Sequence, residues 1–147
     1  MYKRLLVPVD GSELSDRAMH DSVALARQLG AAITGFVAEP IQPAFSDSRP
    51  HSMWAEDTKE HDARTAAHAR QVLDKFEAVA RAAGVPFDGI HDQVRRVDSA
   101  IIQAAESQGC DLIVMVTHGR GAFGEFLFGS HTKAVLAGSK LPLLVLH

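Results

Sequence analysis

Three near-continuous apolar runs divide the chain, at residues 5–9, 112–116 and 141–146. Runs without polar alternation are typical of strands buried on both faces, as in a parallel sheet covered by helices. Residues 32–38 and 87–94 are weaker strand candidates, the second with an alternating polar pattern. The pattern therefore predicts five strands.

Helical periodicity fills the intervals between these runs. A first helix is expected before Gly30, with one apolar face made of Leu14, Ala18, Leu25 and Leu29. A longer helix is expected from about residue 56 to residue 83, with an apolar face made of Val72, Phe76, Val79 and Ala83. Asp98 is well placed to cap a third helix that ends before Gly109. Ser130 is well placed to cap a fourth helix that ends before Gly138.

Strands that alternate with helices predict a parallel sheet built from right-handed crossovers. We expect a single α/β domain over residues 1–147, with a five-stranded doubly wound sheet in the order 3-2-1-4-5. The strand order then reverses between strands 1 and 4. A ligand is expected in the crevice at the carboxyl ends of those two strands.

The stretch from residue 40 to residue 55 holds three prolines and shows no clear period. It is expected to be a long connection between a strand and a helix, and such connections are functional or mobile. Phe45 and Trp54 are its large aromatic residues. They are expected either to pack down as a lid or to contact a partner.

Candidate chemistry gathers where strands 1 and 4 end. Asp10 leaves strand 1 and either caps the next helix or accepts hydrogen bonds from a ribose or base. Strand 4 leads into Thr117-His118-Gly119, and nine residues later Gly129-Ser130-His131-Thr132 opens a helix. Glycines let a backbone approach a ligand, and free N–H groups with a hydroxyl at a helix N-terminus favour phosphate. An anion-binding loop and a merely flexible turn both remain open at this point.

Taken together, several motifs resemble the universal stress protein family. They are VPVDGS at the start, CDLIVM in strand 4, THGRG after it, the GS helix start and LPLLVL at the end. The resemblance implies an adenine nucleotide alpha-hydrolase-like fold and usually a homodimer. In the nucleotide-binding branch it also implies ATP or AMP, with Mg²⁺ as a possible companion, bound by G-x2-G-x9-G-[S/T].

Carried over to this sequence, the resemblance implies a nucleotide site formed by Pro8, Val9, Asp10, Val37, Met115, Val116, His118, Gly119, Gly129, Ser130, His131 and Thr132. Val37 matches an adenine contact, and Met115 matches the residue that closes the pocket from strand 4. Gly119, Gly129 and Ser130 match the phosphate-binding part of the pattern, Thr132 matches a hydroxyl near the phosphates, and His118 is expected to orient the loop.

The departure from the pattern is Val116, which stands where the family motif has its first glycine. A β-branched side chain at this position would intrude on the ribose. Two hypotheses follow. The first is a nucleotide-binding regulatory homodimer in the stress response, which acts on an unknown downstream protein. The alternative is a nucleotide-independent dimeric interaction module with a closed or degenerate pocket.

Composition narrows the function classes. With a net charge of −3 and 22% charged residues, the chain offers no basic surface, and no nucleic-acid partner is expected. No apolar run approaches the roughly 20 residues that span a bilayer. The N-terminus does not read as a signal peptide, so no membrane association and a cytoplasmic location are expected.

Metal and hydrolase chemistry are not expected either. Cys110 is the single cysteine and is expected to be inert in the core. His61 and His68 are seven residues apart, about 10.5 Å along a helix, which is too far to grip one ion. We expect a solvated helix face there and no structural metal. Ser12 and Ser130 lack the G-x-S-x-G elbow, so we expect no enzyme, although slow ATP hydrolysis stays open.

The last apolar run is expected to be an edge strand and a dimer contact. It consists of Leu141, Pro142, Leu143, Leu144, Val145 and Leu146. Free N–H and C=O groups on an unprotected edge favour association with a second copy around a two-fold axis. The family resemblance implies the same surface.

Overall fold

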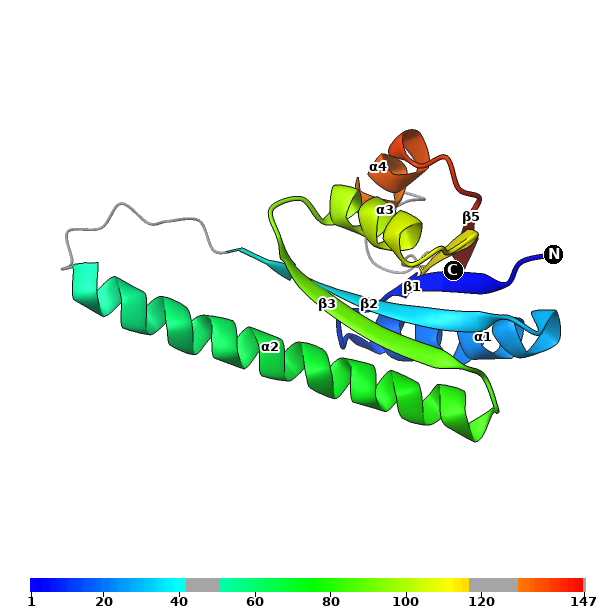
Figure 1. Cartoon of the computed structure of the whole chain (residues 1–147), viewed down its shortest axis with the longest axis horizontal. Helices are drawn as coiled ribbons and strands as arrows, with labels where there is room; N and C mark the ends of the chain where they lie inside the picture. Colours follow the sequence, from blue (N-terminus) through cyan, green and yellow to red (C-terminus); the bar gives the residue numbers. More distant parts are fainter. Residues whose placement is uncertain (42–50, 117–129, 147) are drawn as a thin grey trace.

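The computed structural model describes residues 1–41, 51–116 and 130–146. Its strands form one parallel sheet in the order β3-β2-β1-β4-β5, so the predicted fold class and strand order are confirmed. Figure 1 shows the elements, which are β1 (Arg4–Pro8), α1 (Glu13–Leu29), β2 (Ala32–Pro40), α2 (His51–Ala82), β3 (Phe87–Val94), α3 (Val97–Ser107), β4 (Leu112–Val116), α4 (Ser130–Gly138) and β5 (Leu143–Leu146).

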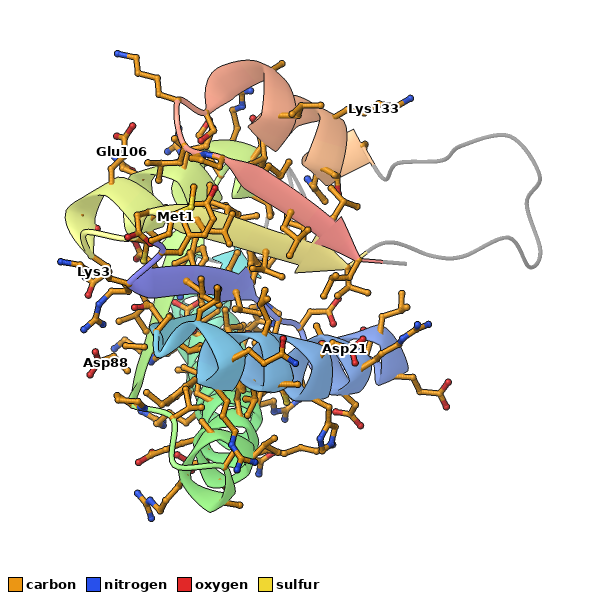
Figure 2. The ribbon with its side chains drawn as sticks, turned by 90° about the vertical axis from the view of Figure 1, so that its right-hand side faces the viewer. Met1, Lys3, Asp21, Asp88, Glu106 and Lys133 are labelled. Atoms are coloured by element: carbon orange, nitrogen blue, oxygen red, sulfur yellow. The ribbon has the colours of Figure 1, made fainter. Side chains whose placement is uncertain are left out.

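Helices cover the sheet on both faces. Successive side chains of a strand point to opposite faces, and β1 shows this division clearly. Leu5 and Val7 are fully buried in a cluster with residues of α1 and α2, whereas Leu6 is buried in a second cluster with residues of α3 and α4. This two-sided burial explains why the strands read as continuous apolar runs. Figure 2 shows the sheet from its β5 edge, with α4 above the strands and α1 below them.

Capping residues set the ends of α1. Ser12 is its N-cap, and its hydroxyl accepts a hydrogen bond from the Ser15 N–H at 3.3 Å. Gly30 ends the helix in the left-handed conformation, with φ of 66°, as its sequence position predicts. No helix of the described residues is both long and apolar enough to cross a membrane.

The predicted cap of α3 is wrong. The helix begins at Val97 and its N-cap is Arg96, which makes no capping hydrogen bond through its side chain. Asp98 instead lies in the first turn, where a carboxylate Oδ2 lies 2.8 Å from Arg96 Nη2. A carboxylate in the first turn complements the helix dipole much as a capping residue does, so the sequence pattern fits both positions.

The connection after β2 is shorter than predicted. Pro40 still belongs to β2, where it pairs with Val94 of β3, and residues 51–55 already belong to α2. A proline is tolerated there because this end of β2 pairs with β3 alone, and the Ile41 N–H donates to the Val94 carbonyl in its place. Trp54 is therefore a helix residue, and Phe45 lies outside the described residues, so the lid hypothesis is untested.

Candidate functional site

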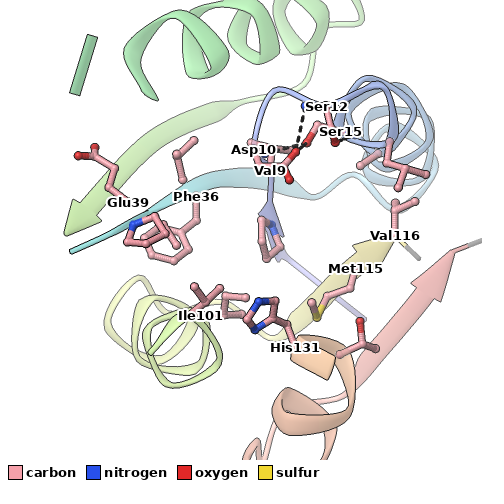
Figure 3. Close-up of a pocket in the computed structure, with 18 of the residues that line it drawn as sticks. Val9, Asp10, Ser12, Ser15, Phe36, Glu39, Ile101, Met115, Val116 and His131 are labelled. Atoms are coloured by element: carbon pink, nitrogen blue, oxygen red, sulfur yellow. Dashed lines mark hydrogen bonds between the residues drawn. The ribbon is translucent and has the colours of Figure 1, made fainter. Parts of the chain in front are cut away.

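A cavity of about 1310 Å³ opens at the carboxyl ends of β1, β2 and β4. It lies at the predicted switch point, and Figure 3 shows its walls. The sequence-predicted site residues that line it are Pro8, Val9, Asp10, Val37, Met115, Val116, Ser130, His131 and Thr132. His118, Gly119 and Gly129 lie outside the described residues. Residues far apart in the chain thus share one cavity.

Asp10 is held by a small hydrogen-bond network at the start of α1. Its N–H donates to Ser15 Oγ at 2.7 Å, while the Ser15 hydroxyl donates to Asp10 Oδ1 at 2.6 Å. The Ser12 N–H donates to the same Oδ1 at 3.0 Å. Ser12 therefore caps the helix and Asp10 braces the turn. Both carboxylate bonds of the described residues use Oδ1, so Oδ2 remains an acceptor for a ligand.

This network also fixes the charge of Asp10. Burial raises the pKa of the carboxyl, but the hydrogen bonds from Ser12 and Ser15 outweigh that effect and hold the pKa below its ordinary value. Asp10 is therefore ionised in neutral solution. An ionised carboxylate with one open oxygen suits hydroxyl or amine donors of a ligand.

The turn is pressed against α2 at Gly11. Its φ is 84°, in the left-handed region, and an added Cβ would lie 2.9 Å from Val72 Cγ2 and 3.1 Å from His68 Cε1. His68 Nε2 lies 3.2 Å from the Asp10 carbonyl oxygen. His68 is exposed on α2, in line with the predicted solvated face, but its ring also contacts the turn and lines the cavity, which was not predicted. The partner is 58 residues away, which no local spacing reveals.

Apolar side chains form much of the cavity wall. Phe36 of β2, Ile101 of α3 and Met115 of β4 are buried and line its α3 side. Val116 also lines the cavity, and its half-buried side chain packs against the cluster shared by α1 and α2. Sequence reasoning missed several lining residues, which are Ser15, Phe36, Glu39, Thr65, His68, Val97 and Ile101. They read as ordinary core or surface positions until the chain is folded.

The first turn of α4 supplies the polar end of the cavity. Ser130 is the first residue of the helix, and residue 129, before it, lies outside the described residues. Ser130 and His131 are exposed, whereas Thr132 is only 3% exposed. Figure 3 shows the His131 ring at the start of α4, near Ile101. N–H groups of a first helical turn together with hydroxyls favour an anion.

A model of the Universal stress protein family matches residues 1–147. The chain belongs to the universal stress protein family. A curated universal stress protein of Thermus aquaticus is 33% identical to it over 145 residues, which cover 99% of this chain and 98% of the relative. The family prediction is thereby confirmed.

Solved structures share the fold of this universal stress protein. UspA from Lactobacillus plantarum matches with a TM-score of 0.78 and 22% identity, over 99% of this chain and 98% of that one. A universal stress protein in complex with cAMP matches with a TM-score of 0.67 and 22% identity, over 99% and 97% of the two chains. A protein from Archaeoglobus fulgidus in complex with dAMP matches with a TM-score of 0.66 and 16% identity, over 99% and 98%.

Neither a metal centre nor a reactive thiol emerges from the part of this universal stress protein that the structure describes. There, no three His, Cys, Asp or Glu side chains gather as metal ligands. Cys110 is 5% exposed, and burial raises the pKa of its thiol, although a hydrogen bond from Thr34 opposes the effect. A buried thiol with a raised pKa is a poor nucleophile.

The packing of the turn against α2 gives a testable prediction. Gly11→Ala should lower the free energy of unfolding by about 2–4 kcal/mol. An alanine is strained in the left-handed conformation of residue 11, and its methyl group would also overlap Val72. Gly84→Ala is the matched control, since Gly84 has φ of 71° but no atom within 4 Å of an added Cβ. It should lose only about 1–2 kcal/mol. Urea unfolding measures both, and equal losses would contradict the close contact with α2.

Proposed function

We propose that this universal stress protein binds ATP or AMP in the cavity and acts as a regulatory homodimer. The observation that carries the proposal is the cavity itself. It combines an apolar wall, an ionised carboxylate and the N-terminus of a helix at the switch point of a doubly wound sheet. These three parts match a base, a ribose and a phosphate.

The base fits the β2 side of the cavity. Pairing of β1 with β2 ends at Pro8 and Phe36, after which the Val9 N–H donates to the Phe36 carbonyl at 2.9 Å. β2 continues to Pro40 beside β3 alone. The β1-facing backbone of β2 beyond Phe36 therefore borders the cavity. Phe36, Ile101 and Met115 supply apolar surface for a planar ring.

The phosphates fit the α4 side of the cavity. Ser130 and Thr132 offer hydroxyls in the first turn, where backbone N–H groups and the helix dipole attract negative charge. Mg²⁺ would accompany a triphosphate through the phosphate oxygens. Two structural neighbours are complexes with cAMP and dAMP, both adenine nucleotides, which supports the same ligand class here.

Binding rather than catalysis is the inferred role. Ser15 Oγ is committed to the Asp10 carboxylate and to the Asp10 N–H, a structural arrangement. His68 contacts the Asp10 carbonyl instead of a hydroxyl that it could activate. A nucleotide at the switch point would bias a surface recognised by a downstream protein partner, and slow hydrolysis would be incidental.

The rival is a nucleotide-independent interaction module with a closed pocket. In the sequence, a valine at position 116 in place of the motif glycine favours a closed pocket. In the structure, however, the Val116 side chain packs against the cluster shared by α1 and α2. The cavity beside it keeps a volume of about 1310 Å³, above the range usual for small-molecule sites. This observation favours nucleotide binding.

The phosphate site can be tested at Ser130. Ser130→Ala should weaken ATP binding by about 1–2 kcal/mol, or about 5- to 30-fold, because one hydrogen bond to a charged group is lost. Adenosine, which has no phosphate, should bind the variant and the wild type equally. Ser99→Ala, an exposed serine of α3 outside the cavity, is the control. Calorimetry showing unchanged ATP affinity in Ser130→Ala would remove this residue from the site.

The sugar site can be tested at Val116. Because its side chain packs toward α1, Val116→Gly should change ATP affinity by less than about threefold, while costing up to about 1 kcal/mol of stability. Calorimetric titration and urea unfolding measure the two effects. A tenfold gain in affinity would mean that the valine obstructs the ribose, as the sequence alone suggests.

The dimer is proposed through residues 141–146. β5 is an edge strand whose residues 143–146 are all half-buried, and Leu144 packs toward the cluster shared by α1 and α2. Light scattering should give a dimer mass for the wild type at micromolar concentration, with or without ATP. Leu144→Asp should give monomer, aggregate or unfolded protein, because the interface would bury an unpaired charge.

The control for the dimer adds the same charge elsewhere. Leu29→Asp, at the exposed end of α1, should remain a dimer. A wild-type monomer at micromolar concentration, or a stable Leu144→Asp dimer, would refute the interface.

A further inference from the structure

Glu39 is a buried acid at the cavity. It is the second-last residue of β2, its exposed fraction is only 2%, and it lines the cavity. Figure 3 shows it with Phe36 on the β2 side, apart from the Asp10 network and from His131. Ionisable side chains are rarely buried unless they are paired, so its surroundings decide what it can do.

Those surroundings leave the carboxylate short of hydrogen-bond donors. Its Oε1 lies against His91 Nδ1 on the neighbouring strand. Among the described residues, however, no donor reaches this buried oxygen in hydrogen-bonding geometry. Each oxygen of a carboxyl group can accept a hydrogen bond, and a buried acceptor without donors is costly. The carboxylate thus has unused capacity for a donor that a ligand could bring.

The nearby polar groups of α2 are already engaged. The Thr65 hydroxyl donates to the His61 carbonyl at 2.8 Å, and His68 Nε2 lies against the Asp10 carbonyl. Both residues line the same cavity as Glu39. A donor for Glu39 is therefore more readily supplied by a ligand than by these side chains.

The position of Glu39 on β2 indicates which part of the ligand its side chain would contact. Glu39 and Val37 are two residues apart and so lie on the same face of the strand, beyond the point where β1 pairing ends. Asp10, at the end of β1, is the acid nearer the expected sugar. Glu39 thus belongs to the base end. The donors of a nucleobase are its exocyclic amine and ring N–H groups.

We propose that Glu39 is a specificity-determining residue that accepts a hydrogen bond from the exocyclic amine of adenine. The inference rests on the proposed nucleotide function. Oε1 is the fully buried oxygen and lies against His91, so the contact falls to Oε2. Oε2 accepts no hydrogen bond from the described residues and acts as a single acceptor. A single acceptor matches the one amine of adenine, whereas the carbonyl oxygen of hypoxanthine at the same ring position would face the carboxylate as a second acceptor and be repelled.

The test compares ATP with ITP, which differ at that ring position, by calorimetry on the full chain. The wild type should bind ATP at least tenfold more tightly than ITP. Glu39→Gln should bring the two affinities within about threefold, because an amide accepts from an amine and also donates to a carbonyl. Asp92→Asn, which neutralises an exposed acid of β3 outside the cavity, should keep the wild-type ratio.

The outcomes separate the possible failures. An unchanged ATP-to-ITP ratio in Glu39→Gln would overturn the proposal and leave Glu39 as a structural partner of His91. Binding of neither nucleotide to the wild type would defeat the proposed function itself. If Glu39→Gln fails to fold, Glu39→Asp keeps the charge but withdraws it by one methylene. The ATP-to-ITP affinity ratio of Glu39→Asp should then fall well below that of the wild type, and a ratio equal to that of the wild type would overturn the proposal.

Discussion

The pairing of β1 with both β2 and β4 is the constraint on which the rest of the structure depends. β1 is the central strand, with Leu5 in register with Ile33 on one side and Leu112 on the other. α1 leaves β1 to cover one face, whereas α4, the next described element after β4, covers the opposite face. Because the helices that follow β1 and β4 cover opposite faces of the sheet, a crevice is left at the carboxyl ends of these two strands. The cavity is a consequence of this topology.

Contacts between distant segments then give the cavity its chemistry. α2 packs Val72 and His68 against Gly11, and this contact supports the turn that carries Asp10. Burial raises the pKa of Asp10, but hydrogen bonds from Ser12 and Ser15 outweigh this effect and lower it. β2 extends beyond the point where its pairing with β1 ends, and this extension places Glu39 at the β2 side of the cavity. Glu39 and Thr132 are therefore placed by a strand and a helix, and Asp10 by a short turn that Ser15 of α1 and His68 of α2 hold, which favours a preorganised site.

Much of this arrangement could be predicted from the sequence. Apolar runs marked the strands, because strands buried on both faces carry no polar alternation. The alternation of strands with helices then indicated a doubly wound sheet, for which the order 3-2-1-4-5 was predicted. Glycines ended helices where a left-handed residue was needed, as at Gly30. Errors arose where one residue type serves two positions, as for Asp98 in the first turn of α3. His68 and Glu39 were missed because their roles depend on partners in other segments, which neither periodicity nor spacing encodes.

The central claim is that the cavity at the carboxyl ends of β1 and β4 holds an adenine nucleotide. The most direct measurement is a calorimetric titration of purified, nucleotide-free protein with ATP, repeated with AMP as competitor. We expect one ATP per chain with a Kd in the micromolar range, about −7 to −8 kcal/mol, and displacement of ATP by AMP. Absence of binding at millimolar ATP by folded protein would contradict it.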